Sequence, residues 1–449
     1  MADQHTNTAA HQPGQLKRTL GPVMLWGLGV GYVISGMYFG WNLGLAEGGT
    51  LGLAVATLFI IVMYVTFTFS YTELACAIPR AGGAFDYATR ALGPRWGFVG
   101  GMAQNIEFIF APPAIALSIG AYFNIFFPQI PVLAIAMFAY VLFTGLNIYG
   151  VKAAAAFELG ITILAVLELL IFSGATLPHI SMAHLTQNSL PHGWQGIFAA
   201  IPFAIWFFLG IEGVANVAEE AVNPQRNVFI GFGSAIFTLV LLCVLTFGSS
   251  VGVGGWEAIV YKNGTGGATS DSPLPLALRM VVSNGNYLYH MLVVIGLFGL
   301  VASFHGILLA AGRTTFEFGR VGYAPRILGK VNETTRSPIF ALLFNMVIGV
   351  IALLTGRTDQ IITISVFGAL TLYIISMISL MVLRKKEPGL DRPFRVPMYP
   401  LFPWVALIIA AVSIIAMGIY NSKLGLIYLA FLGLSYLYFH FFVEKRANT

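Results

Sequence analysis

Four glutamates lie inside strongly apolar segments of this sequence: Glu107, Glu158, Glu168 and Glu212. Glu212 stands in W-F-F-L-G-I-E-G-V, and no Lys or Arg occurs within ten positions of it. An ionisable side chain at the centre of a membrane costs about 2.5–3.5 kcal/mol on insertion scales, so such groups are usually functional or paired. A buried acid without a basic partner must be protonated, solvated in a cavity or neutralised by a bound cation. These residues therefore predict a site for a cationic ligand or a proton.

The segments that carry these acids belong to a chain with the composition of a membrane protein. Of its 449 residues, 57% are hydrophobic and 9% are charged, too few to cover a soluble globule of this size. Apolar runs of about 20 residues, enough to cross a bilayer as a helix, recur along the chain. We predict an all-α integral membrane protein with twelve transmembrane helices, at residues 20–46, 50–77, 97–126, 131–149, 153–177, 197–219, 229–251, 286–315, 338–355, 359–383, 402–420 and 424–442.

The distribution of Lys and Arg predicts how these spans are oriented. If the N-terminus is cytoplasmic, nineteen of the 23 basic residues lie at the inner side, and the outer loops keep only Lys262, Arg279, Arg357 and Lys423. This is a strong positive-inside bias, and it requires an even number of spans. We expect a multi-pass protein of the cell (plasma or inner) membrane with both termini in the cytoplasm. The net charge of +5 is then a consequence of topology, and a nucleic-acid partner is not indicated.

The chain shows no soluble insertion or linker that would divide it. We expect residues 1–16, which are polar and lack a signal-peptide pattern, to be a disordered cytoplasmic tail. Residues 17–449 then form one transmembrane domain. Cys76 and Cys243 fall in apolar spans and offer no metal-binding set, so no metal and no cofactor are predicted.

Two of the predicted spans are interrupted by glycine near their midpoints. The first reads G-V-G-Y-V-I-S-G-M-Y-F-G-W over residues 29–41, and the sixth contains Gly210 and Gly213. Broken helices at membrane depth are tolerated where they line a cavity, and a pair in corresponding positions indicates an inverted repeat. The alternative is that glycines such as Gly36 and Gly40 serve close helix packing.

Four separated stretches resemble the amino acid/polyamine/organocation transporter superfamily. They are E-L-A-C-A-I-P-R-A-G-G-A-F-D-Y at 73–87, A-E-E-A-V-N-P-Q-R-N at 218–227, A-A-G-R-T-T-F-E-F-G-R-V-G-Y-A-P at 310–325 and R-P-F-R-V-P-M-Y-P-L-F-P at 392–403. The resemblance implies a LeuT-like fold of two inverted five-helix repeats, about 17–178 and 197–386, followed by two helices within about 400–443. It also implies alternating-access transport without covalent chemistry, with substrate between the first, third, sixth, eighth and tenth helices.

The resemblance extends to individual site residues. Trp206 and Glu212 match the aromatic gate and the acid of the arginine/agmatine antiporters, and Asn105 matches an Asn of their third helix. Glu107 is an addition that we expect to face the pocket. Glu212 could instead be a protonated carboxyl bonded to backbone. The predicted substrate-binding residues are Ser35, Gly36, Met37, Tyr38, Trp41, Asn105, Glu107, Trp206, Phe207, Gly210, Ile211 and Glu212.

The fifth helix departs from the pattern of proton-coupled relatives. Many of them carry a Lys thirteen residues after the basic residue that opens this helix, and counting from Lys152 reaches Ala165. Glu158 stands where a Gln or Asn is usual. The family's lysine site therefore cannot be carried over. The candidates for binding a coupling proton or ion are Glu158, Glu212 and His305, although His305 could simply be hydrogen-bonded, and transport could also be uncoupled.

The surplus of acids predicts a cationic substrate. Aromatic rings beside one carboxylate make a receptor for an ammonium group through cation–π attraction and charge. The bulky Met37, Tyr38 and Trp41 after Ser35–Gly36 disfavour a substrate carboxylate there, and both broken segments look like the ethanolamine permease branch. We therefore expect a permease for ethanolamine or a similar small amine, as a monomer or homodimer in the lipid bilayer. The alternatives are an amino acid or diamine permease or exchanger and, from another class, a channel or receptor.

Overall fold

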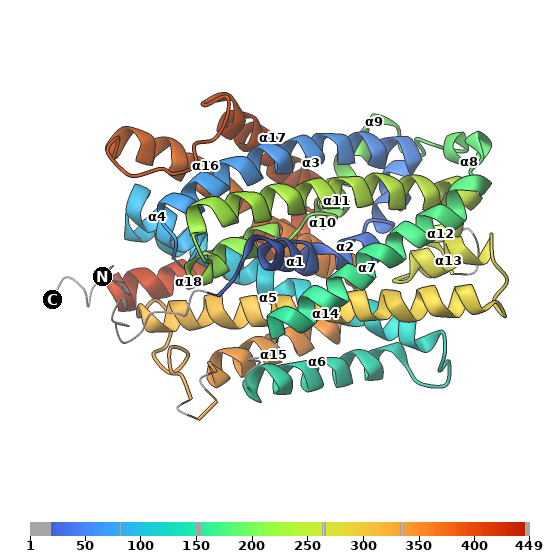
Figure 1. The fold of residues 1–449 in the computed structure, drawn as a ribbon, viewed down its shortest axis with the longest axis horizontal. Coiled ribbons are helices and arrows are strands. Elements are labelled where there is room, and N and C mark those ends of the chain that lie inside the picture. Colours follow the sequence, from blue (N-terminus) through green and yellow to red (C-terminus); the bar gives the residue numbers. More distant parts are fainter. Residues whose placement is uncertain are drawn as a thin grey trace, which may run out of the picture.

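The protein is described by a computed structural model in which most helices run along one long axis (Figure 1). The structure describes residues 19–80, 82–149, 154–262, 264, 266–332, 334, 335 and 337–444. The predicted tail 1–16, Lys152 and Arg336 lie outside the described residues, and the side chains of 154–157, 216–220, 224 and 225 are likewise not described.

The described residues form helices throughout. In chain order they are α1 (Pro22–Val33), α2 (Ser35–Tyr38), α3 (Leu43–Ala77), α4 (Ala84–Leu92), α5 (Pro94–Asn124), α6 (Val132–Tyr149), α7 (Ala154–Thr176), η1 (Leu177–His179), α8 (Met182–Thr186), α9 (Gly193–Ala199), α10 (Ile201–Trp206), η2 (Ile211–Glu220), α11 (Pro224–Gly254), α12 (Trp256–Val260), α13 (Pro273–Arg279), α14 (Tyr287–Arg320), α15 (Ile339–Leu353), α16 (Thr358–Lys386), α17 (Leu401–Tyr420), α18 (Ser422–Tyr438) and η3 (Phe439–Glu444).

The prediction of an all-helical membrane protein is confirmed, but the number of full-length spans is lower than twelve. Within the described residues, nine helices are long and apolar enough to cross a membrane, and the pair Gly193–Ala199 and Ile201–Ala215, bent by 41°, would make a tenth. The other two predicted spans contain α1 and α15, which have 12 and 15 residues. Helix α3 has a kink at the non-helical Gly49, which lies between the predicted end of the first span at 46 and the predicted start of the second at 50.

Both predicted helix interruptions are present. In the first span the backbone is extended at Phe39 and turns at Gly40, whose φ is +87°. In the sixth span, residues 207–210 form a turn after α10, and Gly210 has a φ of +99°. Only glycine takes such a φ without strain, so these two positions decide where the helices break. The first break therefore follows Ser35–Gly36, which lie in the short helix α2.

The bundle has two distinct ends. Helix α4 and the last turns of α18 lie at one end, and α8, α9, α12 and α13 lie at the other (Figure 1). We call them the inner and outer ends, after the orientation that the sequence predicts.

At the inner end, Arg384 donates two hydrogen bonds, of 2.8 and 2.6 Å, to the buried carboxylate of Glu73. The backbone N–H of Val396 donates a third, of 2.7 Å, to the same carboxylate. These bonds connect the end of α3 to the end of α16 and to the segment that follows it.

Candidate substrate-binding site

The centre of the bundle holds two acids side by side. Glu107 on α5 and Glu212 on η2 are fully buried, and their carboxyl groups interact with one another. In the part of the chain that the structure describes, no N–H or O–H group donates to either carboxyl oxygen of Glu107. Two adjacent carboxylates in an apolar site cannot both stay ionised unless a cation joins them. The pair must therefore hold a proton or a positively charged group.

The backbone of Glu107 is held in place by α16. The hydroxyl of Ser365 donates a 2.8 Å hydrogen bond to the carbonyl oxygen of Glu107. One turn later, Gly368 packs so closely on α5 that a Cβ there would lie 2.6 Å from the carbonyl oxygen of Ala103. No larger residue fits at Gly368 without separating the two helices, so this contact sets the depth of Glu107.

Glu212 is positioned by the break of the sixth span. It follows the turn at Gly210, and Gly213 packs on the Tyr32 ring of α1, where a Cβ would meet that ring at 2.8 Å. The hydroxyl of Tyr373 on α16 donates a 3.0 Å hydrogen bond to Oε2 of Glu212. Parts of the first, third, sixth and tenth predicted spans thus meet around the two acids.

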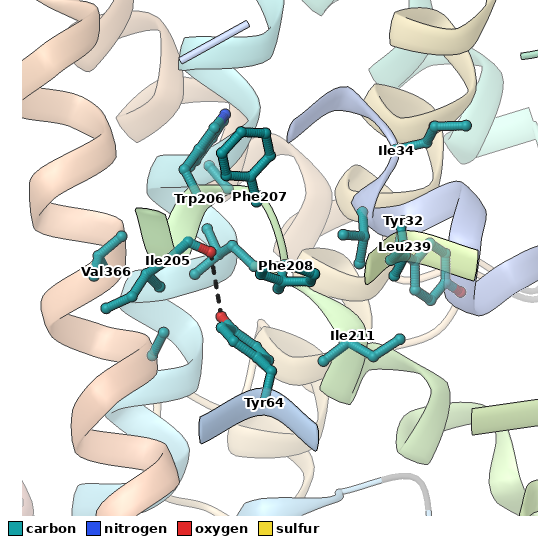
Figure 2. Close-up of a cluster of buried hydrophobic side chains, with 14 of the residues drawn as sticks. Tyr32, Ile34, Tyr64, Ile205, Trp206, Phe207, Phe208, Ile211, Leu239 and Val366 are labelled. Carbon is teal, nitrogen blue, oxygen red and sulfur yellow. Dashed lines mark hydrogen bonds between the residues drawn. The ribbon is translucent and has the colours of Figure 1, made fainter. Parts of the chain in front are cut away.

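Tyrosines extend this network away from Glu212. The hydroxyls of Tyr373 and Tyr64 lie 2.9 Å apart, and that of Tyr64 is directed at the carbonyl oxygen of Ile205 on α10 at 3.4 Å (Figure 2). The rings of Phe67 and Phe208 pack beside them. The acids are therefore bordered by aromatic faces, a lining that suits an ammonium group.

An aromatic layer closes the site on the outer side. Trp206 lies against Gly40, where a Cβ would be 2.4 Å from the indole nitrogen, and its ring is 5.5 Å from that of Phe39. Trp41 stacks on Phe207 at 5.4 Å. The two helix breaks therefore close on each other through their own aromatic side chains, and Figure 2 shows Trp206 and Phe207 adjacent to one another.

Residues of other helices also cover the Ser35–Gly36 segment. A Cβ at Gly36 would lie 2.4 Å from the carbonyl oxygen of Trp206. Ser303 on α14 donates hydrogen bonds to the hydroxyl of Ser35 at 2.8 Å and to the carbonyl oxygen of Tyr32 at 2.7 Å. The first, sixth and eighth predicted spans are joined here by direct contacts.

Comparison with known proteins agrees with this architecture. The sequence profile of the amino acid permease family matches residues 20–436. This chain belongs to that family. Its members are transporters and not enzymes, so this permease is a multi-pass membrane transporter, as the sequence predicted. Family membership also implies the LeuT-like fold, whereas the ethanolamine branch is not singled out by the comparisons.

Several curated proteins are similar to this permease over nearly their whole length. An uncharacterized transporter of Rhizobium meliloti (strain 1021) is 30% identical, with 97% of this chain and 95% of the relative covered. A branched-chain amino acid permease of Bacillus subtilis (strain 168) is 25% identical, with 90% and 89% covered. The methylthioribose transporter of the same strain is 24% identical, with 89% and 88% covered.

One buried pair joins Tyr38, a predicted substrate-binding residue, to Glu168, which the sequence analysis did not include among the site residues. Tyr38 donates a 2.6 Å hydrogen bond to Glu168 on α7 and lies 3.2 Å from the carbonyl oxygen of Ala165. Tyr122 donates to the carbonyl oxygen of Tyr38 at 3.3 Å. Glu168 therefore faces the segment just before the first break, one turn after Ala165.

Three predicted residues lie outside the immediate surroundings of the acid pair. Asn105 accepts a 2.8 Å hydrogen bond from Thr315 on α14, although it is only two residues from Glu107. Glu158 lies between Gly31 of α1 and Gly306 of α14. A Cβ added at Gly31 would be 3.5 Å from its Oε1, and one added at Gly306 would be 2.7 Å from it. His305 faces Phe143 of α6, with ring centroids 6.1 Å apart.

The remaining predicted residues are buried near the two breaks. The carbonyl oxygen of Met37 accepts a 3.0 Å hydrogen bond from the Trp41 indole. Ile211 lies beside Gly29 of α1. Tyr373, Tyr64, Ser365 and Ser303 were missed, because the chain contains 18 tyrosines and many serines in apolar segments and nothing in their spacing distinguishes these four.

Proposed function

We propose that this protein is a secondary transporter for an amino acid or a related small amine, whose ammonium group binds at Glu107 and Glu212. The observation that carries this proposal is that two fully buried carboxyl groups are close enough to interact in the middle of the bundle, with no hydrogen-bond donor to Glu107 among the described residues. A cation brought by the cargo relieves their repulsion, and the rings of Tyr64, Tyr373 and Phe208 surround it. Alternating opening of the two ends would carry the cargo across the membrane.

The relatives favour an amino acid over ethanolamine as the cargo. Those with named substrates include permeases for branched-chain and for aromatic amino acids. An amino acid, the alternative substrate in the sequence analysis, is therefore the first candidate for the cargo. A sugar-derived cargo, as in the methylthioribose transporter, is less compatible with paired acids at the site.

Ethanolamine remains the second candidate because of one specific contact. The carbonyl of Trp206 covers Gly36, and the hydroxyl of Ser35 is engaged by Ser303. A cargo carboxylate that used the Ser35–Gly36 amides would have to displace both contacts. A cargo with a hydroxyl in place of the carboxylate would need less space there.

Uptake into proteoliposomes made with the full chain distinguishes these candidates. Labelled L-leucine, L-alanine, L-arginine, putrescine and ethanolamine are tested one at a time, each in competition with the others unlabelled. We expect saturable uptake of at least one amino acid that ethanolamine inhibits weakly. Uptake of ethanolamine alone would make it the cargo, and uptake of none of the five would contradict the proposal.

The role of the acid pair is tested by removing one carboxylate. Glu212→Gln keeps the shape and hydrogen-bonding capacity of the side chain but removes its charge. We expect loss of binding of the transported compound, measured by calorimetry on the purified protein. Glu387→Gln, an exposed acid at the inner end, is the matched control and should bind normally. Unchanged affinity of Glu212→Gln would locate the ammonium site elsewhere.

The same pair can link transport to protons. An empty pair retains a proton and a bound ammonium replaces it, so cargo and proton compete for one site. Glu158 is the second coupling candidate, since it lies between α1 and α14 with Oε1 free of hydrogen bonds from the described residues. Uptake with imposed proton or sodium gradients, for the native protein and Glu158→Gln, tests this. A proton gradient should accelerate uptake, and the absence of any gradient effect would indicate uncoupled transport.

A further inference from the structure

An open cavity of about 580 Å³ lies at the outer end, beside α9 and α10. Its other walls come from the start of α3, the loop before α13, the start of α16 and the connection between α17 and α18. Phe203 lines it, and this residue lies three positions before Trp206 on α10. The cavity is therefore next to the helix that carries Trp206.

The cavity is lined by charged side chains of both signs. Lys262 and Arg357 supply positive charge, and Glu47, Asp271 and Asp359 supply negative charge. Lys262 and Asp359 both act electrostatically on Asp271, yet none of the five makes an ion pair with another residue of the described chain. Their charges are therefore available to a ligand.

One wall is the N-terminus of the 29-residue helix α16, which has no side-chain cap. Helix N-termini attract carboxylates through their free N–H groups and the helix dipole. Thr358, the first residue of the helix, lines the cavity and is only 5% exposed. Its hydroxyl is near the Asp271 carboxylate but makes no full hydrogen bond with a described residue. A buried hydroxyl without a partner is costly, so it marks a place where a ligand would be held.

We propose that this cavity is a second binding site, for a zwitterionic amino acid on its way to the central site. The carboxylate of the ligand lies at the start of α16, where Thr358 and Arg357 contact it. Its ammonium group faces Asp271. The inference rests on the proposed function, because it assumes that the cargo is an amino acid.

The mixture of charges is what selects this class of ligand. A simple anion at the start of α16 meets the acids Asp271 and Asp359 with no compensating positive charge of its own. A simple cation such as ethanolamine pairs with Asp271 but leaves Thr358 and Arg357 without a partner. Only a molecule with both charges a few ångströms apart satisfies both sides of the cavity.

Binding to the full-length Glu212→Gln protein isolates this site, because that substitution removes the central ammonium site. The probes are labelled L-leucine, L-alanine and L-arginine, measured separately by equilibrium dialysis. We expect weak, saturable binding of at least one. Adding Thr358→Val or Asp271→Asn should weaken it about tenfold, the effect of losing one hydrogen bond to a charged group, while Thr358→Ser should retain it. Absence of binding, or equal binding by all these variants, would overturn the proposal.

Competitors test the need for both charges. L-Leucinamide lacks the carboxylate and 4-methylpentanoate lacks the ammonium group, so neither should displace L-leucine from this site when L-leucine binds there. Displacement by either compound as effective as that by L-leucine itself would contradict a zwitterion site.

Uptake by proteoliposomes separates the failure of this inference from that of the proposed function. If the native protein transports none of the amino acids, the proposed function is wrong. If it transports one, Thr358→Val and Asp271→Asn should raise KM several-fold and leave kcat unchanged, because loading is impaired and the central step is not. An unchanged KM in both variants, with native-like thermal stability, would overturn the outer site alone.

Discussion

The hydroxyl of Tyr373 lies 3.0 Å from Oε2 of Glu212 and donates a hydrogen bond to it, although 161 positions separate the two residues in the chain. The same hydroxyl is 2.9 Å from that of Tyr64. A carboxylate on the broken sixth span is thereby joined to α16 and α3 at once. A change in the charge of Glu212 therefore affects both of those helices through these hydrogen bonds.

Removing this hydroxyl should weaken cargo binding. In Tyr373→Phe the Glu212 carboxylate loses one donor, worth about 1.5–3 kcal/mol for a charged acceptor, which corresponds to roughly a 10- to 100-fold rise in the KM of uptake. Tyr87→Phe is the control, since Tyr87 is equally buried but its hydroxyl has no hydrogen bond with the described residues. Equal KM values for the two variants would mean that Tyr373 only fills space.

The break of the first span should not tolerate a side chain at Gly40. Gly40→Ala adds a Cβ 2.4 Å from the Trp206 indole nitrogen and forces a non-glycine residue to a φ of +87°, a strain of about 1–2 kcal/mol before any clash. We expect reduced thermal stability and loss of uptake. Gly248→Ala, at a helical position of α11 with open space around it, should be neutral or slightly stabilising. Active Gly40→Ala would show that this contact is not maintained during transport.

Two of the arginine–glutamate pairs of the inner end should differ in their effect on stability. Arg384→Ala removes two hydrogen bonds from the buried Glu73 carboxylate, which keeps Arg392 at 3.3 Å and the N–H of Val396 as partners, so the cost is about 1.5–3 kcal/mol. Arg90→Ala removes the partner of Glu387 in an exposed pair, where the cost is about 0.2–1 kcal/mol. Thermal unfolding in detergent should therefore show a much larger loss for Arg384→Ala. Similar losses would contradict a special role for the Glu73 cluster.

Binding in the outer cavity should depend on pH. Burial raises the pKa of Asp271 to about 6, although Thr358 and Lys262 act in the opposite direction and Asp359 adds to the rise. The carboxylate that faces the ammonium group therefore forms only as pH rises through about 6, and Arg357 and Glu47 complete the charged surroundings. We expect L-alanine affinity of the Glu212→Gln protein to increase from pH 5 to 7.

The raised pKa of Asp271 should also make the stability of the folded protein fall as pH rises, opposite to the trend in binding, and this fall serves as a control. Between about pH 3.9, the usual pKa of an Asp, and pH 6, the folded protein keeps a proton on Asp271 that the unfolded chain releases. The contribution of Asp271 to stability is therefore complete at low pH and is lost as pH rises through about 6. Asp271→Asn should flatten both the binding profile and this part of the stability profile. A persistent pH dependence of binding in Asp271→Asn would assign it to another group.

Much of the architecture could be predicted because a membrane imposes strong rules. Long apolar runs specify helices, and the broken first and sixth spans were visible because glycine is needed where φ is positive, as at Gly40 and Gly210. The acids inside the spans were visible because charge is rare in such segments. The boundaries were less accurate, as α3 shows, since its helix resumes directly after the single non-helical residue Gly49.

The partners of each side chain could not be predicted in the same way. Helix α5 is buried on nearly all sides, so it has no polar face that would reveal where Glu107 or Asn105 points. Those two residues are two positions apart and contact different helices, η2 and α14. Tyr373 and Ser365 carry no local signal at all, because only their packing against distant helices gives them a role.

The sequence by itself determined that this chain is a helical membrane protein with acids inside its apolar spans and two interrupted helices, since hydropathy, charge and glycine act locally. Only the tertiary structure decided that Glu107 meets Glu212, that Tyr38 binds Glu168 and that the start of α16 opens into a charged outer cavity. Such contacts join segments far apart in the chain, and they depend on helix rotation and depth, which packing sets and local sequence does not.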